Sequence, residues 1–206
     1  MEEHAAVMLD HDSTSDRSCV PEFRVLTVCT GNLYRSPLTE WLLWERLAAV
    51  REAIHVSSAG TRAVPGMPMD ATAASLVVAR CGHPPGRVAR RLTAGLVESA
   101  DLVLGASVEH REAAVRLAPV RALSRAFSLR EFARLVRAED GADMVDPATR
   151  FAALVAGAAA RRSAASPDAA DDDVADPLGG GEALVRECVQ RIEESVERIA
   201  LALGVG

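Results

Sequence analysis

Residues 23–38 read FRVLTVCTGNLYRSPL, and this stretch decides the fold. The apolar run Phe23–Val28 has the composition of a buried parallel strand. Pro37 suits the first turn of a following helix, where its missing N–H costs nothing. A short loop that begins at Cys29 joins the two. The stretch therefore predicts a strand, a tight loop and the start of a helix.

The loop contains Cys29 and Arg35, with five residues between them. A loop of this length can curl so that its backbone N–H groups point inward, and the following helix adds its positive end. Arg35 would close this anion cradle, because a planar guanidinium matches two phosphate oxygens. Cys29 would lie at the floor, where the same field favours a thiolate nucleophile. A cysteine that ends a buried strand is usually a small core residue, so this spacing alone is a weak signal.

The residues between the two make the pattern specific, because the loop resembles that of the low-molecular-weight protein tyrosine phosphatases. Their loop is Cys, any residue, Gly-Asn, two residues and Arg-Ser-Pro, and here it reads Cys29, Thr30, Gly31, Asn32, Leu33, Tyr34, Arg35, Ser36 and Pro37. Further matches follow in the same order at Glu40, Ser58–Thr61, Gly66, Pro68, Asp70, Ala89-Arg90, Asp101–Val103 and Asp176-Pro177. On these motifs the chain is identified as a member of the bacterial type of this family.

The resemblance implies a phosphomonoesterase with a cysteinyl-phosphate intermediate, acting on phosphotyrosine proteins or other phosphomonoesters. Cys29 would be the nucleophile, and no metal or other cofactor is implied. Ser58, at the end of the second strand, matches the position that supports Asn32. The phosphate would be bound by the loop residues Thr30, Gly31, Asn32, Leu33, Tyr34, Arg35 and Ser36.

The resemblance points to Asp176 as the general acid. Asp176 precedes Pro177, which would stiffen the loop that presents the carboxyl group. A second Asp-Pro pair lies at Asp146-Pro147, where Pro147 suits a first helical turn and Asp146 its N-cap. We therefore favour Asp176. The neighbouring Asp171–Asp173 are interpreted as solvated charges.

Several positions depart from the family pattern. Tyr34 stands where many members have a second loop cysteine, which excludes reversible oxidation through that pair. Leu178 replaces the tyrosine of Asp-Pro-Tyr, and Arg87 falls where a histidine orients the loop. The loop after Ser-Ala-Gly-Thr offers no aromatic residue to stack on an aryl substrate; its apolar candidates are Val64, Pro65, Met67 and Met69.

Two alternative functions stay open at this point. Arsenate reductases of the same fold use a similar anion loop, but their thioredoxin-linked form needs two more cysteines near the third strand. The stretch after Asp101, LVLGASVEHREAAV, has none. A form that relies on a low-molecular-weight thiol would not need them, so the reductase stays open. A non-catalytic oxyanion-binding regulatory module is the other alternative, which the departures at Arg87 and Leu178 keep open.

Composition indicates one globular domain. The chain has 206 residues, 49% of them hydrophobic, and a formal net charge of −6, which argues against general affinity for nucleic acid or anionic membranes. No stretch has the apolar length of a membrane span, and the acidic N-terminus is unlike a signal peptide. We expect a cytoplasmic protein with reduced thiols, since the four cysteines show no metal spacing. Its oligomeric state stays open.

The alternation of strands and helices predicts an α/β fold with a parallel sheet, and the resemblance makes it three-layered, with four strands and helices on both faces. The expected strands are 23–28, 54–59, 102–105 and 120–123. Four expected helices span residues 37–53, 71–80, 147–162 and 182–203, and Asp70 is expected to cap the second of them. A further helix is expected to begin after its cap Ser107 and to end at 117. Another is expected to begin at a Ser128–Glu131 capping box and to end at 137. Residues 1–21 are predicted to be a disordered tail, and 138–175 an insertion in the 22–206 domain, ending in a flexible acidic linker, SAASPDAADDD.

Overall fold

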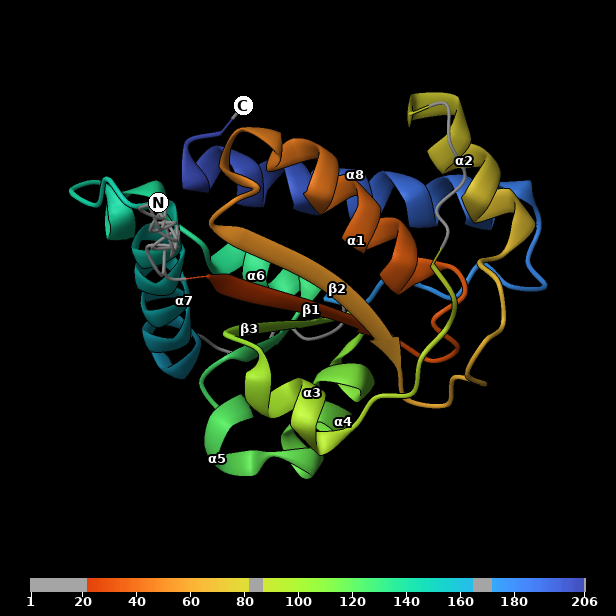
Figure 1. The fold of residues 1–206 in the computed structure, drawn as a ribbon, viewed down its shortest axis with the longest axis horizontal. Helices are drawn as coiled ribbons and strands as arrows, with labels where there is room; N and C mark the ends of the chain where they lie inside the picture. The colour runs from red at the N-terminus through yellow and green to blue at the C-terminus, as the bar shows by residue number, and fades with distance from the viewer. Residues whose placement is uncertain (1–21, 82–86, 165–171, 206) are drawn as a thin grey trace, which may run out of the picture.

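A computed structural model describes residues 22–81, 87–164 and 172–205 of the protein. Its centre is a four-stranded parallel sheet in the order β2-β1-β3-β4 (Figure 1). The strands are β1 (Phe23–Cys29), β2 (Ile54–Gly60), β3 (Leu102–Gly105) and β4 (Ala126–Ser128). The predicted α/β class and the first three strands are confirmed.

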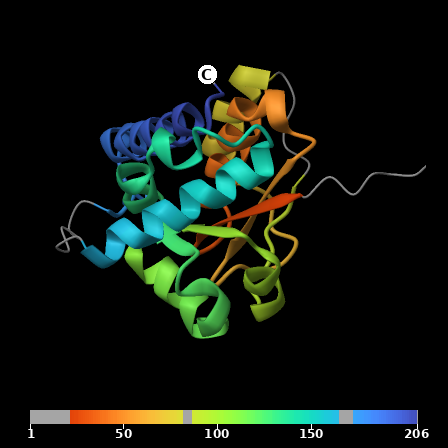
Figure 2. The same cartoon turned by 90° about the vertical axis from the view of Figure 1, so that its left-hand side faces the viewer.

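Helices cover both faces of this sheet, as Figures 1 and 2 show from two sides. One layer contains α1, α6 and α8, with α7 beside them; α3, α4 and α5 form the other. The helices are α1 (Arg35–Arg46), α2 (Ala71–Cys81), α3 (Ala94–Ser99), α4 (Val108–Leu117), α5 (Pro119–Ala122), α6 (Leu129–Leu135), α7 (Pro147–Ala164) and α8 (Glu182–Leu203), with short 3-10 helices η1 (Ala48–Val50) and η2 (Ala138–Gly141).

Side chains of β1 alternate between the two cores, as strand geometry requires. Phe23 and Val25 pack with α1, α7 and α8, whereas Leu26 and Val28 pack with α3, α4 and α5. The strand is therefore buried on both faces, and its carboxyl end is held in place by both helix layers. The loop that follows Cys29 starts from this fixed point.

The predicted fourth strand, 120–123, is wrong. Pro119 opens the helix α5 instead, and Val120 and Leu123 are 93% and 69% exposed. The fourth strand begins at Ala126, where the fully buried Phe127 supplies the apolar contact with the core. Pro119 is compatible with the first turn of a helix, and this signal outweighs the apolar character of the segment.

The first helix is also shorter than predicted. It begins at Arg35 and ends at Arg46, and the 3-10 helix η1 occupies part of the remaining segment. The predicted helices 71–80, 147–162 and 182–203 correspond to α2, α7 and α8, and the Ser128–Glu131 capping box is present at α6.

Much of the segment predicted to be an insertion, 138–175, is part of the main core. The ring of Phe151 on α7 is fully buried and stacks on Phe23 of β1, with 4.5 Å between the ring centroids. The predicted tail, 1–21, and residues 165–171 of the predicted linker lie outside the described residues. The domain division stays a prediction.

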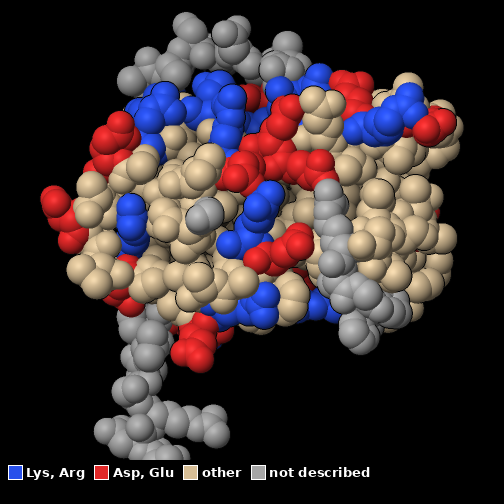
Figure 3. Space-filling model, turned by 90° about the horizontal axis from the view of Figure 1, so that it is seen from above, with Lys and Arg blue, Asp and Glu red and all other residues tan. Residues whose placement is uncertain are grey.

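The face that carries α1 and α8 presents acidic and basic side chains side by side (Figure 3). Ion pairs such as Arg46–Glu197 and Arg191–Glu187 lie there, while the opposite side of α8 buries Cys188, Ile192 and other apolar residues. This is the predicted amphipathic helix. Within the described ranges, no helix combines the length and the apolar character that a membrane crossing needs.

Candidate active site

The loop after β1 folds around the thiol of Cys29, which is 2% exposed. The backbone N–H of Asn32 donates to Sγ at 3.3 Å, and Ser36 Oγ lies 3.0 Å from the same sulfur. A Cβ at Gly60, the last residue of β2, would lie 2.6 Å from the carbonyl oxygen of Thr30. Only glycine permits this close approach between the second strand and the loop.

Asn32 has a φ of +57°, a left-handed conformation that asparagine tolerates better than most residues. Three hydrogen bonds hold its side chain. Nδ2 donates to Ser36 Oγ at 3.0 Å and to Ser58 Oγ at 2.8 Å, and Oδ1 accepts from the backbone N–H of Arg90 at 2.9 Å. The structure therefore brings Ser58 to Asn32, as the resemblance implied.

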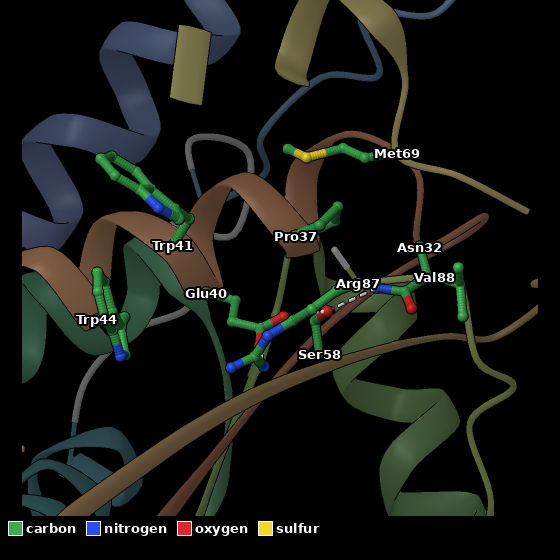
Figure 4. A pocket seen from close by; sticks show the side chains of 9 residues that line it. All are labelled: Asn32, Pro37, Glu40, Trp41, Trp44, Ser58, Met69, Arg87 and Val88. Atoms are coloured by element: carbon green, nitrogen blue, oxygen red, sulfur yellow. Dashed lines mark hydrogen bonds and ion pairs between the residues drawn. The ribbon is translucent and has the colours of Figure 1, made fainter. Parts of the chain in front are cut away.

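A second layer of polar residues supports this network from behind. Ser58 Oγ donates to Glu40 Oε2 at 2.6 Å, and Glu40, only 4% exposed, is paired with Arg87. Arg87 is thus connected to the loop network through the buried carboxylate of Glu40. Figure 4 shows these groups at the floor of a cavity of about 210 Å³, whose apolar walls are Pro37, Trp41, Trp44, Met69 and Val88.

Arg35 connects the loop to the segment before α8. Its guanidinium donates from Nη1 to the carbonyl oxygen of Val174 at 3.0 Å and from Nη2 to Thr30 Oγ1 at 3.4 Å. Nη2 also forms an ion pair with Asp176, whose side chain is 43% exposed. A residue distant in sequence thus brings a half-exposed carboxylate beside the anion-binding loop.

The other Asp-Pro pair lies elsewhere. Asp146 accepts hydrogen bonds from the backbone N–H of Thr149 at 2.8 Å and from its hydroxyl at 2.7 Å, and so caps α7. These hydrogen bonds lower the pKa of Asp146 below its ordinary value. Since α7 packs on Phe23, the first residue of β1, it covers the end of the sheet opposite the Cys29 loop.

The segment that carries Asp176 is anchored by the residues before it. Asp172 is 7% exposed and forms an ion pair with Arg134 at 2.8 Å. Asp173 Oδ1 accepts from the backbone N–H of Val108 at 2.8 Å, at the start of α4. The interpretation of Asp172 as a solvated charge is therefore wrong, whereas Asp173 is exposed, and Asp171 lies outside the described residues. A basic partner and a helix N-terminus attract these carboxylates.

Sequence reasoning missed His110, which lies 3% exposed beside the loop. Its Nε2 is 3.0 Å from Thr30 Oγ1, and its Nδ1 is 2.6 Å from Ser107 Oγ. Ser107, predicted to cap α4, makes no side-chain cap bond and contacts His110 instead. A histidine five residues after a parallel strand lies near the carboxyl edge of the sheet, where ligands bind, and this signal could have identified it.

Burial lowers the pKa of His110 from 6.5 to about 4, and the positive charge of Arg35 acts in the same direction. The carboxylates of Glu109, Asp173 and Asp176 oppose this shift without cancelling it. The imidazole is therefore neutral at physiological pH. Its ring can accept one hydrogen bond and donate another.

Tyr34, at the position of the family's second loop cysteine, points into the core. It is 3% exposed, and burial raises the pKa of its phenol to about 12, with smaller contributions from Cys188 and Asp70. The loop after β2 and the segment after Asp176 expose aliphatic side chains, with exposed fractions of 63% for Val64, 46% for Met67 and 47% for Leu178.

The sequence has relatives among known phosphatases. The sequence model of the family described as low molecular weight phosphotyrosine protein phosphatase matches residues 24–154. The low molecular weight protein-tyrosine-phosphatase Etp of Escherichia coli strain K12 is 39% identical over 95 residues, which cover 46% of this chain and 62% of that protein. The phosphatase Wzb of Salmonella typhi is 34% identical over 96 residues, covering 47% and 62%. The alignments thus span less than two thirds of these relatives.

Solved structures resemble the whole fold. The YwlE arginine phosphatase of Geobacillus stearothermophilus aligns with a TM-score of 0.63 and 24% identity, over 88% of this chain and 93% of that one. Wzb of Vibrio vulnificus, solved with benzylphosphonate, aligns with a TM-score of 0.60 and 22% identity, over 87% of this chain and 98% of that one. The family model includes the Cys29 loop but ends before Asp176, so geometry alone connects Asp176 to the loop. With more than half of its residues matched by the family model, the chain belongs to the low molecular weight phosphotyrosine protein phosphatases.

Proposed function

We propose that this protein hydrolyses phosphomonoesters, with phosphotyrosine in proteins as its substrate class, through a cysteinyl-phosphate intermediate. The observation that carries the proposal is the placing of a buried thiol within a loop of donors, with an arginine and a carboxylate paired beside it. The family to which the chain belongs supports the same reaction. In this scheme the nucleophile, the phosphate donors and the acid are all side chains or backbone groups of the chain.

In the first step, the Cys29 thiolate attacks phosphorus and the bond to the leaving oxygen breaks. Loop N–H groups and the Arg35 guanidinium stabilise the charge on the phosphoryl oxygens. Asp176 donates its proton to the leaving oxygen. Because the phosphate and Asp176 both bind Arg35, the incoming dianion would displace the Asp176 carboxylate from the guanidinium. The displaced carboxylate takes up a proton from solvent, and this is the proton that it gives to the leaving oxygen.

In the second step, water attacks the phosphocysteine. Asp176, ionised by the first step, takes a proton from that water, the S–P bond breaks, and Cys29 leaves as a thiolate. Ser36 Oγ and the N–H of Asn32 stabilise the thiolate, since both lie within hydrogen-bonding distance of Sγ. Asn32 and Ser58 would act indirectly, by holding the loop in its curled conformation.

The rim of the site argues for a modest preference among substrates. By the family resemblance the loop after β2 and the residue after Asp176-Pro177 flank the substrate, and here their exposed side chains Val64, Met67 and Leu178 are aliphatic. An aryl ring would then gain apolar contact but no aromatic stacking from them. A substrate panel should therefore contain phosphotyrosine, phosphoserine and phosphoarginine peptides. Phosphoarginine belongs in the panel because a protein of similar fold is described as an arginine phosphatase.

Neither alternative function gains support from the site. Arsenate reduction through thioredoxin would need further cysteines beside the loop, and the neighbouring segment Ala106–His110 supplies serine and histidine instead. A purely binding module would not need a half-exposed carboxylate beside the phosphate-binding arginine. Membership of a phosphatase family also favours hydrolysis.

Hydrolysis of p-nitrophenyl phosphate, measured with a metal chelator present, tests the proposal. We expect turnover in the unmodified protein and none in Cys29→Ser. Acid-quenched Asp176→Asn should carry one phosphoryl group on Cys29 by peptide mass spectrometry, because loss of the general base slows the second step. Vanadate binding without turnover would favour the binding module, and thiol-dependent arsenate reduction would favour the reductase.

A further inference from the structure

We propose that His110 is a positioning residue for the reaction, and that it acts through the hydroxyl of Thr30 on the guanidinium of Arg35. Nε2 of His110 lies 3.0 Å from Thr30 Oγ1, and the same oxygen lies 3.4 Å from Arg35 Nη2. The three side chains thus form a line from α4, through the loop, to the phosphate-binding arginine. This inference rests on the proposed function and identifies a further residue of the same site.

Two arrangements of the donors satisfy this line. Arg35 can only donate, so Thr30 Oγ1 accepts from it on one of its two lone pairs. In the first arrangement the Thr30 hydroxyl donates to an unprotonated Nε2 of His110, and Nδ1–H donates to Ser107 Oγ at 2.6 Å. In the second, Nε2–H donates to the other lone pair of Thr30 Oγ1, and Nδ1 accepts from the Ser107 hydroxyl. In either tautomer the ring fixes the Thr30 hydroxyl group beside Arg35.

A neutral ring suits this position better than a charged one. Arg35, from α1, lies on one side of His110 and would repel an imidazolium, while Glu109 on its own helix and Asp173 and Asp176 from the preceding segment would attract it. Burial resolves the competition in favour of the neutral form.

The turn between β3 and α4, together with the first turn of α4 that carries His110, also connects the two halves of the site. Ala106 accepts from the backbone N–H of Val174 at 2.8 Å, and the N–H of Val108 is bound by Asp173. Val174 in turn accepts from Arg35. The β3–α4 turn therefore touches the Cys29 loop on one side and the Asp176 segment on the other. A change at His110 should alter the alignment of Arg35 between these two halves.

The test is a set of variants assayed by steady-state kinetics and by vanadate binding. His110→Phe keeps a ring but removes both nitrogens, and with them the hydrogen bonds to Thr30 and Ser107. It should lower kcat/KM for p-nitrophenyl phosphate about tenfold, the effect of losing the buried contact with Thr30. Vanadate affinity should weaken by a similar factor. His110→Gln places an amide oxygen near the position of Nε2, and should stay within about threefold of the unmodified protein.

A double-mutant cycle links the effect to Thr30. Thr30→Val removes the same hydrogen bond and also the contact with Arg35, so the double variant with His110→Phe should be no worse than Thr30→Val alone. The matched control is His55→Phe, which replaces a histidine with a 54% exposed side chain on β2 and should change neither readout. Circular dichroism of each variant establishes that it is folded.

The assignment is overturned if folded His110→Phe keeps both its kinetics and its vanadate affinity, or if the losses at His110 and Thr30 multiply. Vanadate binding is measured by vanadium NMR and needs no turnover. It therefore tests the positioning role even if the unmodified protein fails to hydrolyse the ester, and the two proposals can fail separately.

Discussion

The two Asp-Pro pairs, Asp146-Pro147 and Asp176-Pro177, are the same dipeptide in different surroundings. Asp146 caps α7 near the amino end of β1, where its partners belong to its own helix. Asp176 lies at the carboxyl end of the sheet and pairs with Arg35, which is 141 residues away in sequence. Local sequence gives both aspartates the same turn chemistry. The packing of the segments makes Asp146 a helix cap and places Asp176 beside Arg35.

Replacing each aspartate by asparagine gives the sharpest version of this comparison. Asp176→Asn should lower kcat about 10²- to 10⁴-fold, the range for loss of a general acid and base. Asp146→Asn should leave kcat within about twofold, since an asparagine also caps helices. The measurement is kcat on alkyl and aryl phosphates, with the larger loss on alkyl esters, whose leaving oxygen needs the proton more. Equal losses in both variants would remove the distinction.

Core packing near α7 should affect stability and not chemistry. Phe151→Ala removes a fully buried ring that stacks on Phe23, and should lower the free energy of unfolding by about 3 to 5 kcal/mol. Urea denaturation measures this loss, and active-site titration gives kcat per folded molecule, which should not change. A fall in kcat among the folded molecules would mean that the two ends of the sheet are coupled.

Acid should destabilise the protein through His110, which lies at the same end of the sheet as Asp176. Its pKa is about 4 when folded and 6.5 when unfolded, so the unfolded chain binds more protons between these values. Stability is therefore lost as the pH falls from about 6.5 towards 4, by on the order of 2 to 3 kcal/mol. Urea denaturation against pH should show this slope, and His110→Gln should reduce it. An unaltered slope in that variant would assign the effect to other groups.

The smallest effect is expected at the cap of α7. Asp146→Ala removes the acceptor for the N–H of Thr149, and should lower Tm by about 2 to 4 °C without changing kcat. Differential scanning calorimetry at pH 7 measures the shift. Asp70→Ala, which removes the corresponding N-cap acceptor of α2, is the matched control and should show a similar shift. A loss of kcat in Asp146→Ala would contradict its structural role.

Much of the fold could be predicted because its signals are local. The first three apolar strands, the Ser128–Glu131 capping box and the cap at Asp70 depend on neighbouring residues, and the structure contains them. Errors arose where two local signals competed, as at Pro119, or where a residue's partner is distant in sequence. Asp172 is of the second kind, because it is buried against a partner from α6.

The candidate site also combines features that depend on local sequence with features that depend on distant residues. The Cys29 loop is one continuous segment, so its residue order carries its chemistry and a family could be identified from it. His110 reaches the loop only because β1 and β3 are neighbours in the sheet. Its place five residues after β3 indicates the edge of the sheet where it lies, but does not reveal Thr30 as its partner. The sequence alone also left the choice between Asp146 and Asp176 as a preference.

Local sequence was enough to identify the α/β class, the first three strands, most of the long helices, the Cys29 loop and the family. These features follow from residues close together in the chain, whose conformational preferences and hydrogen bonds are local. Only the tertiary structure decided which carboxylate faces Arg35, that His110 is buried beside Thr30, and that Asp172 is not a free charge. The physical reason is that burial and long-range ion pairs depend on which segments the sheet brings together, and that pairing is not written in any one stretch of sequence.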